Sequence, residues 1–169
     1  MSTTSSESPS FPVEGRLLGI DYGTVRVGIA ICNGEWTIAS PLEIYTRRNA
    51  SLDARYFREL AENYRPAGLV VGLPMHVNGT EGTKAREARE YGAWLSDLTS
   101  LPVTYWDERY TSAVAEEYLL AAEMTRKQRK ARVDKLAAQI LLQGFLNHQQ
   151  ALRRAELLPA DDIADDEEE

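Results

Sequence analysis

Apolar runs alternate with polar, turn-forming segments along the chain and predict five strands. The first two runs, at residues 17–20 and 27–31, are separated by the carboxylate Asp21 and by a short glycine-bearing turn, which predicts a hairpin. Further strands are expected at 36–45, 68–73 and 103–108. Pro41 lies inside the third of these runs and indicates an edge strand or a bulge, because proline cannot donate to a sheet ladder.

Apolar residues at helical spacing predict four helices. The first begins at Ser51, whose side chain would cap it while Asp53 complements the helix dipole. The others are expected at about 83–98, from Thr111 or Ser112 to about 122, and at 133–148, with a charged connector at 123–132. The inner face of the first helix is predicted to be Leu52, Tyr56, Leu60 and Tyr64, and that of the second Ala85, Ala88, Tyr91, Gly92 and Leu95.

The order of these elements predicts an α/β fold. Three strands joined by short turns are expected to be antiparallel, and the two strands separated by helices are expected to be parallel. The result is a mixed five-stranded sheet flanked by helices. Ligands in such sheets bind beyond the carboxyl ends of strands, where the first strand ends at Asp21 and the fifth at Glu108.

Three acidic residues are candidates for a metal site: Asp21, Glu108 and Asp134, the last at the start of the final helix. Converging carboxylates form a hard oxygen site that suits Mg²⁺ or Mn²⁺. Two such ions about 3.5–4 Å apart can activate water for phosphodiester hydrolysis. The alternative is three unrelated acids: a turn acceptor, a strand-end partner of Arg109 and a helix-terminus acid. Asp107 competes with Glu108 for the site, since neighbouring strand residues point to opposite faces.

Two other segments are candidates for phosphate contact. The loop at 74–82 contains Asn78-Gly79, a strong turn signal, and would either offer backbone amides to a phosphate or serve as a plain connector. A basic segment beside Asp134 would either bind a nucleic-acid backbone or form a solvated face. Its members are Arg126, Lys127, Arg129, Lys130, Arg132 and Lys135.

Charge and composition indicate one domain with polar ends. The net charge of −7 comes from residues 161–169, which hold seven acids, and without them acids and bases balance at 19 each. We therefore expect a flexible leader at 1–15, a domain at 16–150 and an acidic, disordered tail at 151–169. One cysteine and two histidines exclude a disulfide framework and argue against a zinc site. No apolar run is long enough for a membrane span, and the leader does not resemble a signal peptide, so we expect a cytoplasmic protein with no membrane partner.

Four motifs occur in the order and spacing of a known family. They read GIDYGTVRVGIA (19–30), VVGLPMHVNGTEG (70–82), DERYTS (107–112) and VDKLAAQILLQGFL (133–146). Together they resemble the YqgF (RuvX-like) family over about residues 16–148. The resemblance implies a ribonuclease H-like fold and an acidic, metal-binding active site at Asp21, Glu108 and Asp134. Ser112 stands where the family often has a second threonine, a mild change.

The resemblance also implies a nuclease, with two substrates left open. One is structured RNA, in the maturation of the 5′ end of pre-16S rRNA, and this is the role we expect. The other is branched DNA, as in a Holliday-junction resolvase similar to RuvC. GIDYGT is similar as well to the phosphate loop of actin-like phosphotransferases, but those enzymes clamp nucleotide between two domains. A non-catalytic nucleic-acid-binding module would gain from losing the three acids, which this chain retains. A monomer and a homodimer both stay open.

Overall fold

A mixed five-stranded sheet forms the centre of the computed structural model, which describes residues 10–111 and 125–158. The strand order is β3-β2-β1-β4-β5. β1 pairs antiparallel with β2, and β2 with β3, whereas β4 lies parallel to both β1 and β5. The predicted α/β fold and its strand directions are therefore confirmed. The strands are β1 (Leu17–Asp21), β2 (Arg26–Cys32), β3 (Ala39–Thr46), β4 (Gly68–Leu73) and β5 (Val103–Asp107).

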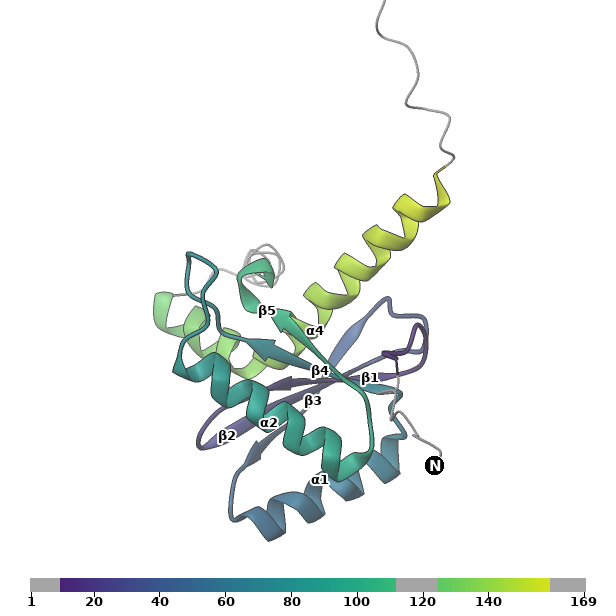
Figure 1. The fold of residues 1–169 in the computed structure, drawn as a ribbon. Helices are drawn as coiled ribbons and strands as arrows, with labels where there is room; N and C mark the ends of the chain where they lie inside the picture. The colour runs from purple at the N-terminus through teal and green to yellow at the C-terminus, as the bar shows by residue number, and fades with distance from the viewer. Residues whose placement is uncertain (1–9, 112–124, 159–169) are drawn as a thin grey trace, which may run out of the picture.

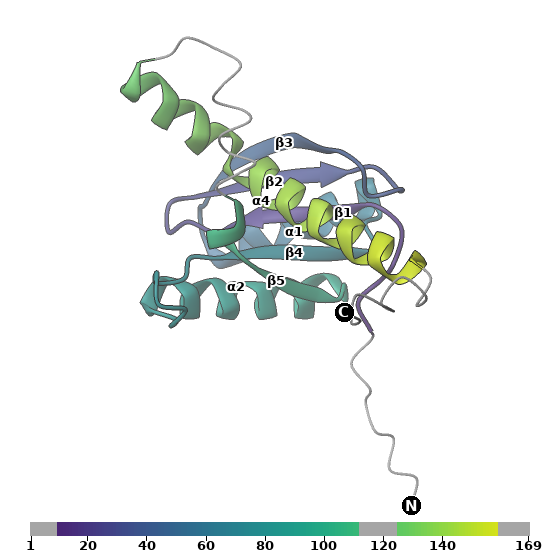
Figure 2. The ribbon, with the colours of Figure 1, turned by 90° about the horizontal axis from the view of Figure 1, so that it is seen from above.

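Helices cover both faces of the sheet (Figure 1). α1 (Ala50–Tyr64) and α2 (Thr83–Thr99) lie side by side on one face, and α4 (Arg126–Leu157) crosses the other (Figure 2). Because strand side chains alternate, Leu18 and Ile20 join the core under α1 and α2, whereas Leu17 joins the core under α4. Among the helices of the described residues, none combines the length and the apolar character needed to cross a membrane.

Glycines let α4 approach the sheet closely. A Cβ atom on Gly19 of β1 would lie 2.8 Å from Leu142 Cβ and 3.1 Å from the Ala138 carbonyl oxygen. A Cβ on Gly28 of β2 would lie 3.3 Å from Ala138 Cβ. Larger residues at either position would push the helix away. The small residues thus fix the distance between α4 and the edge of the sheet where Asp21 lies.

The third strand differs from the prediction at its start. Pro41 does lie on an edge strand, and the β2–β3 register shifts beside it, so both expectations drawn from this proline are confirmed. The strand begins at Ala39 rather than at Trp36, because Asn33 Oδ1 accepts hydrogen bonds from the amides of residues 37 and 38 and closes a turn. Trp36 has a positive φ of 60° in this turn and its ring is buried, with Nε1 donating to the Gly15 carbonyl at 2.7 Å.

α1 and α2 differ in how well their patterns predicted them. The inner face of α2 is the predicted one. α1 instead begins after Asn49, whose side chain accepts from the Leu52 amide, so Ser51 is not its cap. Its buried residues are Asp53, Phe57 and Leu60, and Leu52 is 40% exposed. The helix is rotated from the prediction because Asp53 is buried, its carboxylate accepting from the Tyr45 hydroxyl at 2.7 Å.

The charged connector was predicted wrongly, because the segment from Arg126 is the first part of α4. Thr125 and Gln128 form a capping box there, and lysine, arginine and glutamine are good helix formers. α4 also continues past residue 148 to Leu157, where Gln150 donates to the Glu35 and Trp36 carbonyls. At the other end of the chain, the Phe11 ring lies 5.9 Å from that of Phe145. The helix expected at 112–122 lies outside the described residues, as do residues 161–169 of the acidic segment.

Candidate active site

Asp21 occupies the end of β1 on the face covered by α4. It lies opposite Gly28 in the β1–β2 ladder, and the absence of a side chain on Gly28 leaves room for its carboxylate. A pocket of about 380 Å³ opens here, between the sheet edge and α4. Its lining includes Asp21, Arg26, Asp134 and Lys135. The structure therefore brings two of the three predicted acids, and one predicted base, to the same pocket.

Glu108 approaches the same region from β5. The strand ends one residue earlier than predicted, at Asp107, and Glu108 opens a short 3-10 helix (Glu108–Thr111). Its side chain crosses above Gly72 near the end of β4, where a methyl group would overlap Glu108 Oε1. Since β4 lies between β1 and β5, this direction carries the Glu108 carboxylate toward Asp21.

The carboxyl groups influence one another electrostatically. Burial, together with the negative charge of Asp134, raises the pKa of Asp21 from 3.8 to about 6. Burial, then the charges of Asp21 and Asp107, raises the pKa of Glu108 from 4.5 to about 7. Asp21 thus interacts electrostatically with both of the other acids. A site that concentrates negative charge in this way is poised to accept a cation.

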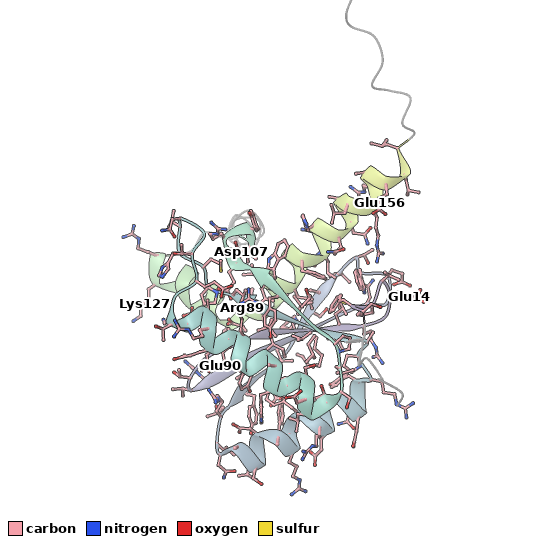
Figure 3. All side chains as sticks on the ribbon, in the orientation of Figure 1. Glu14, Arg89, Glu90, Asp107, Lys127 and Glu156 are labelled. Atoms are coloured by element: carbon pink, nitrogen blue, oxygen red, sulfur yellow. The ribbon has the colours of Figure 1, made fainter. Side chains whose placement is uncertain are left out.

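Asp107 is held differently from Glu108. Arg109 Nε donates to both carboxylate oxygens of Asp107, at 3.1 and 2.9 Å, and these bonds hold the pKa of Asp107 below its usual value. The expected alternative of a Glu108–Arg109 pair is replaced by this neighbouring one. Arg109 also donates to the Val77 carbonyl at 3.2 Å, which ties the 74–82 loop to the segment carrying Glu108. Figure 3 shows Asp107 at the end of β5, beside this loop.

The 74–82 loop is closed by its own hydrogen bonds. The His76 amide donates to the Thr80 carbonyl, the Gly79 amide to the His76 carbonyl, and the Thr80 amide to Asn78 Oδ1. Gly79 has a φ of 85°, as the Asn-Gly turn signal predicts. Three of the loop's amides are thus occupied within the loop and are not offered to a phosphate, and His76 is exposed.

The donor set fits a divalent cation, although the carboxylates are not drawn together into a compact cluster. Within residues 10–111 and 125–158, no three His, Cys, Asp or Glu side chains are close enough to hold a metal ion together. The groups that could hold one are the oxygens of Asp21, Glu108 and Asp134, all hard ligands of the kind Mg²⁺ and Mn²⁺ take. A cation between them would offset both the burial and the repulsion that raise the Asp21 and Glu108 pKa values.

The predicted bases lie along the first turns of α4. Arg126, Lys127 and Lys135 are exposed, and Lys135 reaches the Asp21 pocket. Arg129, Lys130 and Arg132 occupy the helix between them. Figure 3 shows Lys127 on the part of α4 that projects past the sheet.

Three residues of this region were missed at the sequence level. Arg26 lines the Asp21 pocket, and Gly28 and Gly72 make room for the carboxylates. A signal for the glycines was present, because each interrupts an apolar strand, which commonly marks a close approach. Arg26 carries no such signal, since arginine at the start of a hairpin strand is ordinary.

The sequence model of the RuvX family, described as Holliday junction resolvase, matches residues 15–148. The chain belongs to that family, as its motifs predict. Family membership defines the class of this protein: it is a nuclease, a hydrolase of phosphodiester bonds. Its fold is similar to that of Thermus thermophilus RuvC in complex with a Holliday junction substrate, with a TM-score of 0.53 and 14% identity over 80% of this chain and 96% of that one.

The names of curated relatives refer to ribosomal RNA rather than to a Holliday junction. A Rhodopirellula baltica protein is 46% identical over 85% of this chain and 83% of its own length. A Zymomonas mobilis protein is 38% identical over 82% of this chain and 84% of its own length. Both are named "Putative pre-16S rRNA nuclease".

Proposed function

We propose that this chain cleaves pre-16S rRNA near the mature 5′ end, using Mg²⁺ or Mn²⁺ held by Asp21, Glu108 and Asp134. The observation that carries the proposal is that Asp21 shares a pocket with Asp134, while its charge, after burial, helps to raise the pKa of Glu108. Burial of the Asp21 and Glu108 carboxylates near other negative charges lowers stability unless a cation or a proton compensates them. Ribosomal RNA as substrate implies a cytoplasmic protein.

The residues around the pocket have distinct roles in this proposal. Asp21, Glu108 and Asp134 would hold the cation through their carboxylate oxygens. When bound, the cation supplies Lewis acidity toward the phosphodiester. Arg26 and Lys135 line the pocket and would neutralise the phosphates flanking the scissile bond. The bases from Arg126 to Arg132 would follow the RNA backbone away from the site.

Names of relatives support ribosomal RNA as the substrate. The proteins with 46% and 38% identity carry the pre-16S rRNA name, whereas the junction-bound RuvC is only 14% identical. Cleavage of four-way DNA junctions is the second candidate, favoured by the description of the matching family.

A cleavage assay on both substrates tests the proposal. A labelled RNA spanning the mature 5′ end and a labelled four-way junction are incubated with the protein in Mg²⁺, Mn²⁺ or EDTA. We expect cleavage of the RNA with either cation and none in EDTA. Asp21→Asn should abolish it, whereas Asp97→Asn, which changes an exposed acid of α2, should not.

Metal binding is measured separately, by the rise in melting temperature with Mn²⁺ concentration. Asp21→Asn should lose this rise and Asp97→Asn should keep it. Full activity of Asp21→Asn would refute the assignment of the site. Cleavage of the junction alone would replace the RNA role with the second candidate.

A further inference from the structure

A second pocket, of about 600 Å³, lies at the same edge of the sheet but on the face covered by α1 and α2. It is bordered by the β1–β2 turn, by the segment after β3 and by α2. Tyr22, which follows Asp21 directly in the chain, lines it. None of the residues proposed to bind metal or the RNA backbone contributes to its lining.

Three aromatic side chains pack against one another along one wall of this pocket, with ring planes tilted by 47° between Tyr22 and Tyr91 and by 36° between Tyr91 and Trp94. The Tyr22 and Tyr91 ring centroids are 5.0 Å apart, and those of Tyr91 and Trp94 are 5.4 Å apart. The Arg47 guanidinium lies over Tyr22 and Tyr91, at 5.5 and 5.1 Å from their centroids. Aromatic rings and arginine planes of this kind are the surfaces on which unpaired bases stack.

One side chain of the pocket carries a buried hydroxyl that is unpaired among the described residues. Tyr91 is only 7% exposed, and its hydroxyl makes no hydrogen bond within the described part of the chain. Buried polar groups are nearly always paired, and Tyr91 lines the pocket, so its unpaired hydroxyl can bond a ligand that displaces the side chains covering it. The hydroxyl of Tyr45, in the same core cluster, is by contrast paired with Asp53.

The charge of the pocket excludes a simple phosphate site. Its two arginines are matched by three acids, Asp53, Glu87 and Glu90. Asp53 is occupied by the Tyr45 hydroxyl and the Arg48 amide. Glu90, on the outer side of α2 (Figure 3), is exposed and is therefore available to accept hydrogen bonds. A neutral aromatic ring that carries amino groups suits such a mixture better than an anion does.

We propose that this pocket binds one unpaired nucleobase of the substrate strand, a base bearing an exocyclic amino group. The base would stack on the partly exposed rings of Tyr22 and Trp94 and donate an amino hydrogen to Glu90. With the side chains over Tyr91 displaced, it would accept a hydrogen bond from the Tyr91 hydroxyl. The volume lies within the range of small-molecule sites. The identity of the strand rests on the proposed nuclease function. Because Tyr22 adjoins Asp21, the bound base lies within a few nucleotides of the bond to be cut.

Fluorescent base substitution tests this assignment. Single-stranded RNA oligomers carry 2-aminopurine at one position each, stepped across the cleavage region, and are titrated with the Asp21→Asn protein, which binds without cutting. 2-Aminopurine loses fluorescence when it stacks. We expect strong quenching at one or two adjacent positions and little at the others.

Variants of the pocket then locate the quenching. Tyr91→Phe should weaken binding of that oligomer about fivefold, since it removes one hydrogen bond, and should leave the melting temperature unchanged or higher. Glu90→Gln and Trp94→Leu should also reduce the quenching. Glu62→Gln, an exposed acid of α1 outside the pocket, serves as the matched control and should bind as the parent does.

The outcomes separate this pocket from the cleavage site. Oligomer binding without position-dependent quenching, or quenching that survives Tyr91→Phe and Trp94→Leu, would overturn the base pocket and leave the nuclease proposal standing. Saturable binding of free adenosine monophosphate with no effect of strand position would assign the pocket to a free nucleotide and overturn the inference. Position-dependent quenching that the pocket variants remove supports it, even if the wild-type protein cuts neither substrate.

Discussion

Replacing Asp21 with asparagine is expected to stabilise the metal-free protein at neutral pH, although the same change should abolish cleavage. Burial and the charge of Asp134 raise the pKa of Asp21 to about 6, so the folded state holds a proton that the unfolded chain releases near pH 4. The stability of the wild-type protein should therefore fall as the pH rises from about 4 through 6, and level off above that. Asparagine has no charge to lose.

The size of this effect follows from the pKa shift. The shift of Asp21, from 3.8 to about 6, corresponds to about 3 kcal/mol of folding free energy lost by pH 8. The Asp21 charge also contributes to the raised pKa of Glu108, so removing it gives some further relief. For a protein of this length, about 3 kcal/mol corresponds to a rise of roughly 6–12 °C in melting temperature.

Urea unfolding of both proteins in EDTA at pH 4, 6 and 8 provides the assay. The difference in unfolding free energy between variant and wild type should grow by about 3 kcal/mol from pH 4 to pH 8. This change with pH is the informative quantity, because any cost of burying the amide is the same at each pH. Adding Mg²⁺ at pH 8 should stabilise the wild type and not the variant. Parallel stability curves across the pH range would refute the electrostatic reasoning.

Three further outcomes are expected. Gly72→Ala should lower the cleavage rate roughly 10–100-fold by displacing Glu108. The control, Gly92→Ala, crowds the Tyr105 ring instead and should lower the melting temperature without a matching loss of activity per folded molecule. Equal activity losses in the two variants would contradict this. Deleting residues 161–169 should leave the melting temperature unchanged and RNA affinity equal or tighter, since acids repel phosphate, and weaker binding would argue for a role of the segment in recognition. Replacing four basic residues of α4 together by serine should lower RNA affinity. The slope of log affinity against log salt concentration should become flatter by about 0.7–0.9 per lost phosphate contact. An unchanged slope would show that these four residues form a solvated face. The four are Arg126, Lys127, Arg129 and Lys130.

Where periodicity alone decides the structure, the sequence predicted it well. The inner face of α2 and the fully buried β4 match their patterns, because each buries an uninterrupted set of apolar residues. Periodicity failed at α1, where Asp53 counts as polar in any pattern but is buried by its bond to Tyr45. It failed again at Trp36, where one asparagine side chain closes a turn inside an apolar run.

Features assembled from distant segments are harder to predict. The motifs suggested Asp21, Glu108 and Asp134, the acids that we propose to bind metal, but gave no sign of the glycines that leave room for Asp21 and Glu108. The orphan hydroxyl of Tyr91 has no signature in the sequence, since the same residue reads as an ordinary core position of α2. Such sites depend on which side chains fail to find partners, and that is decided only by the packed structure.

Because α4 packs closely against Gly19 and Gly28, the packing of the hydrophobic core sets the distances between the acids of the proposed metal site. Asp134 is carried by the helix and Asp21 by the sheet, so the gap between their carboxylates follows the helix-to-sheet spacing. Mg²⁺ demands ligand distances near 2.0–2.1 Å and tolerates little departure from them. The choice between cations is thus open to adjustment by methyl-sized changes in residues that never contact metal or RNA. Natural variation at these buried positions is a route by which related enzymes can shift ion preference while keeping every acid in place.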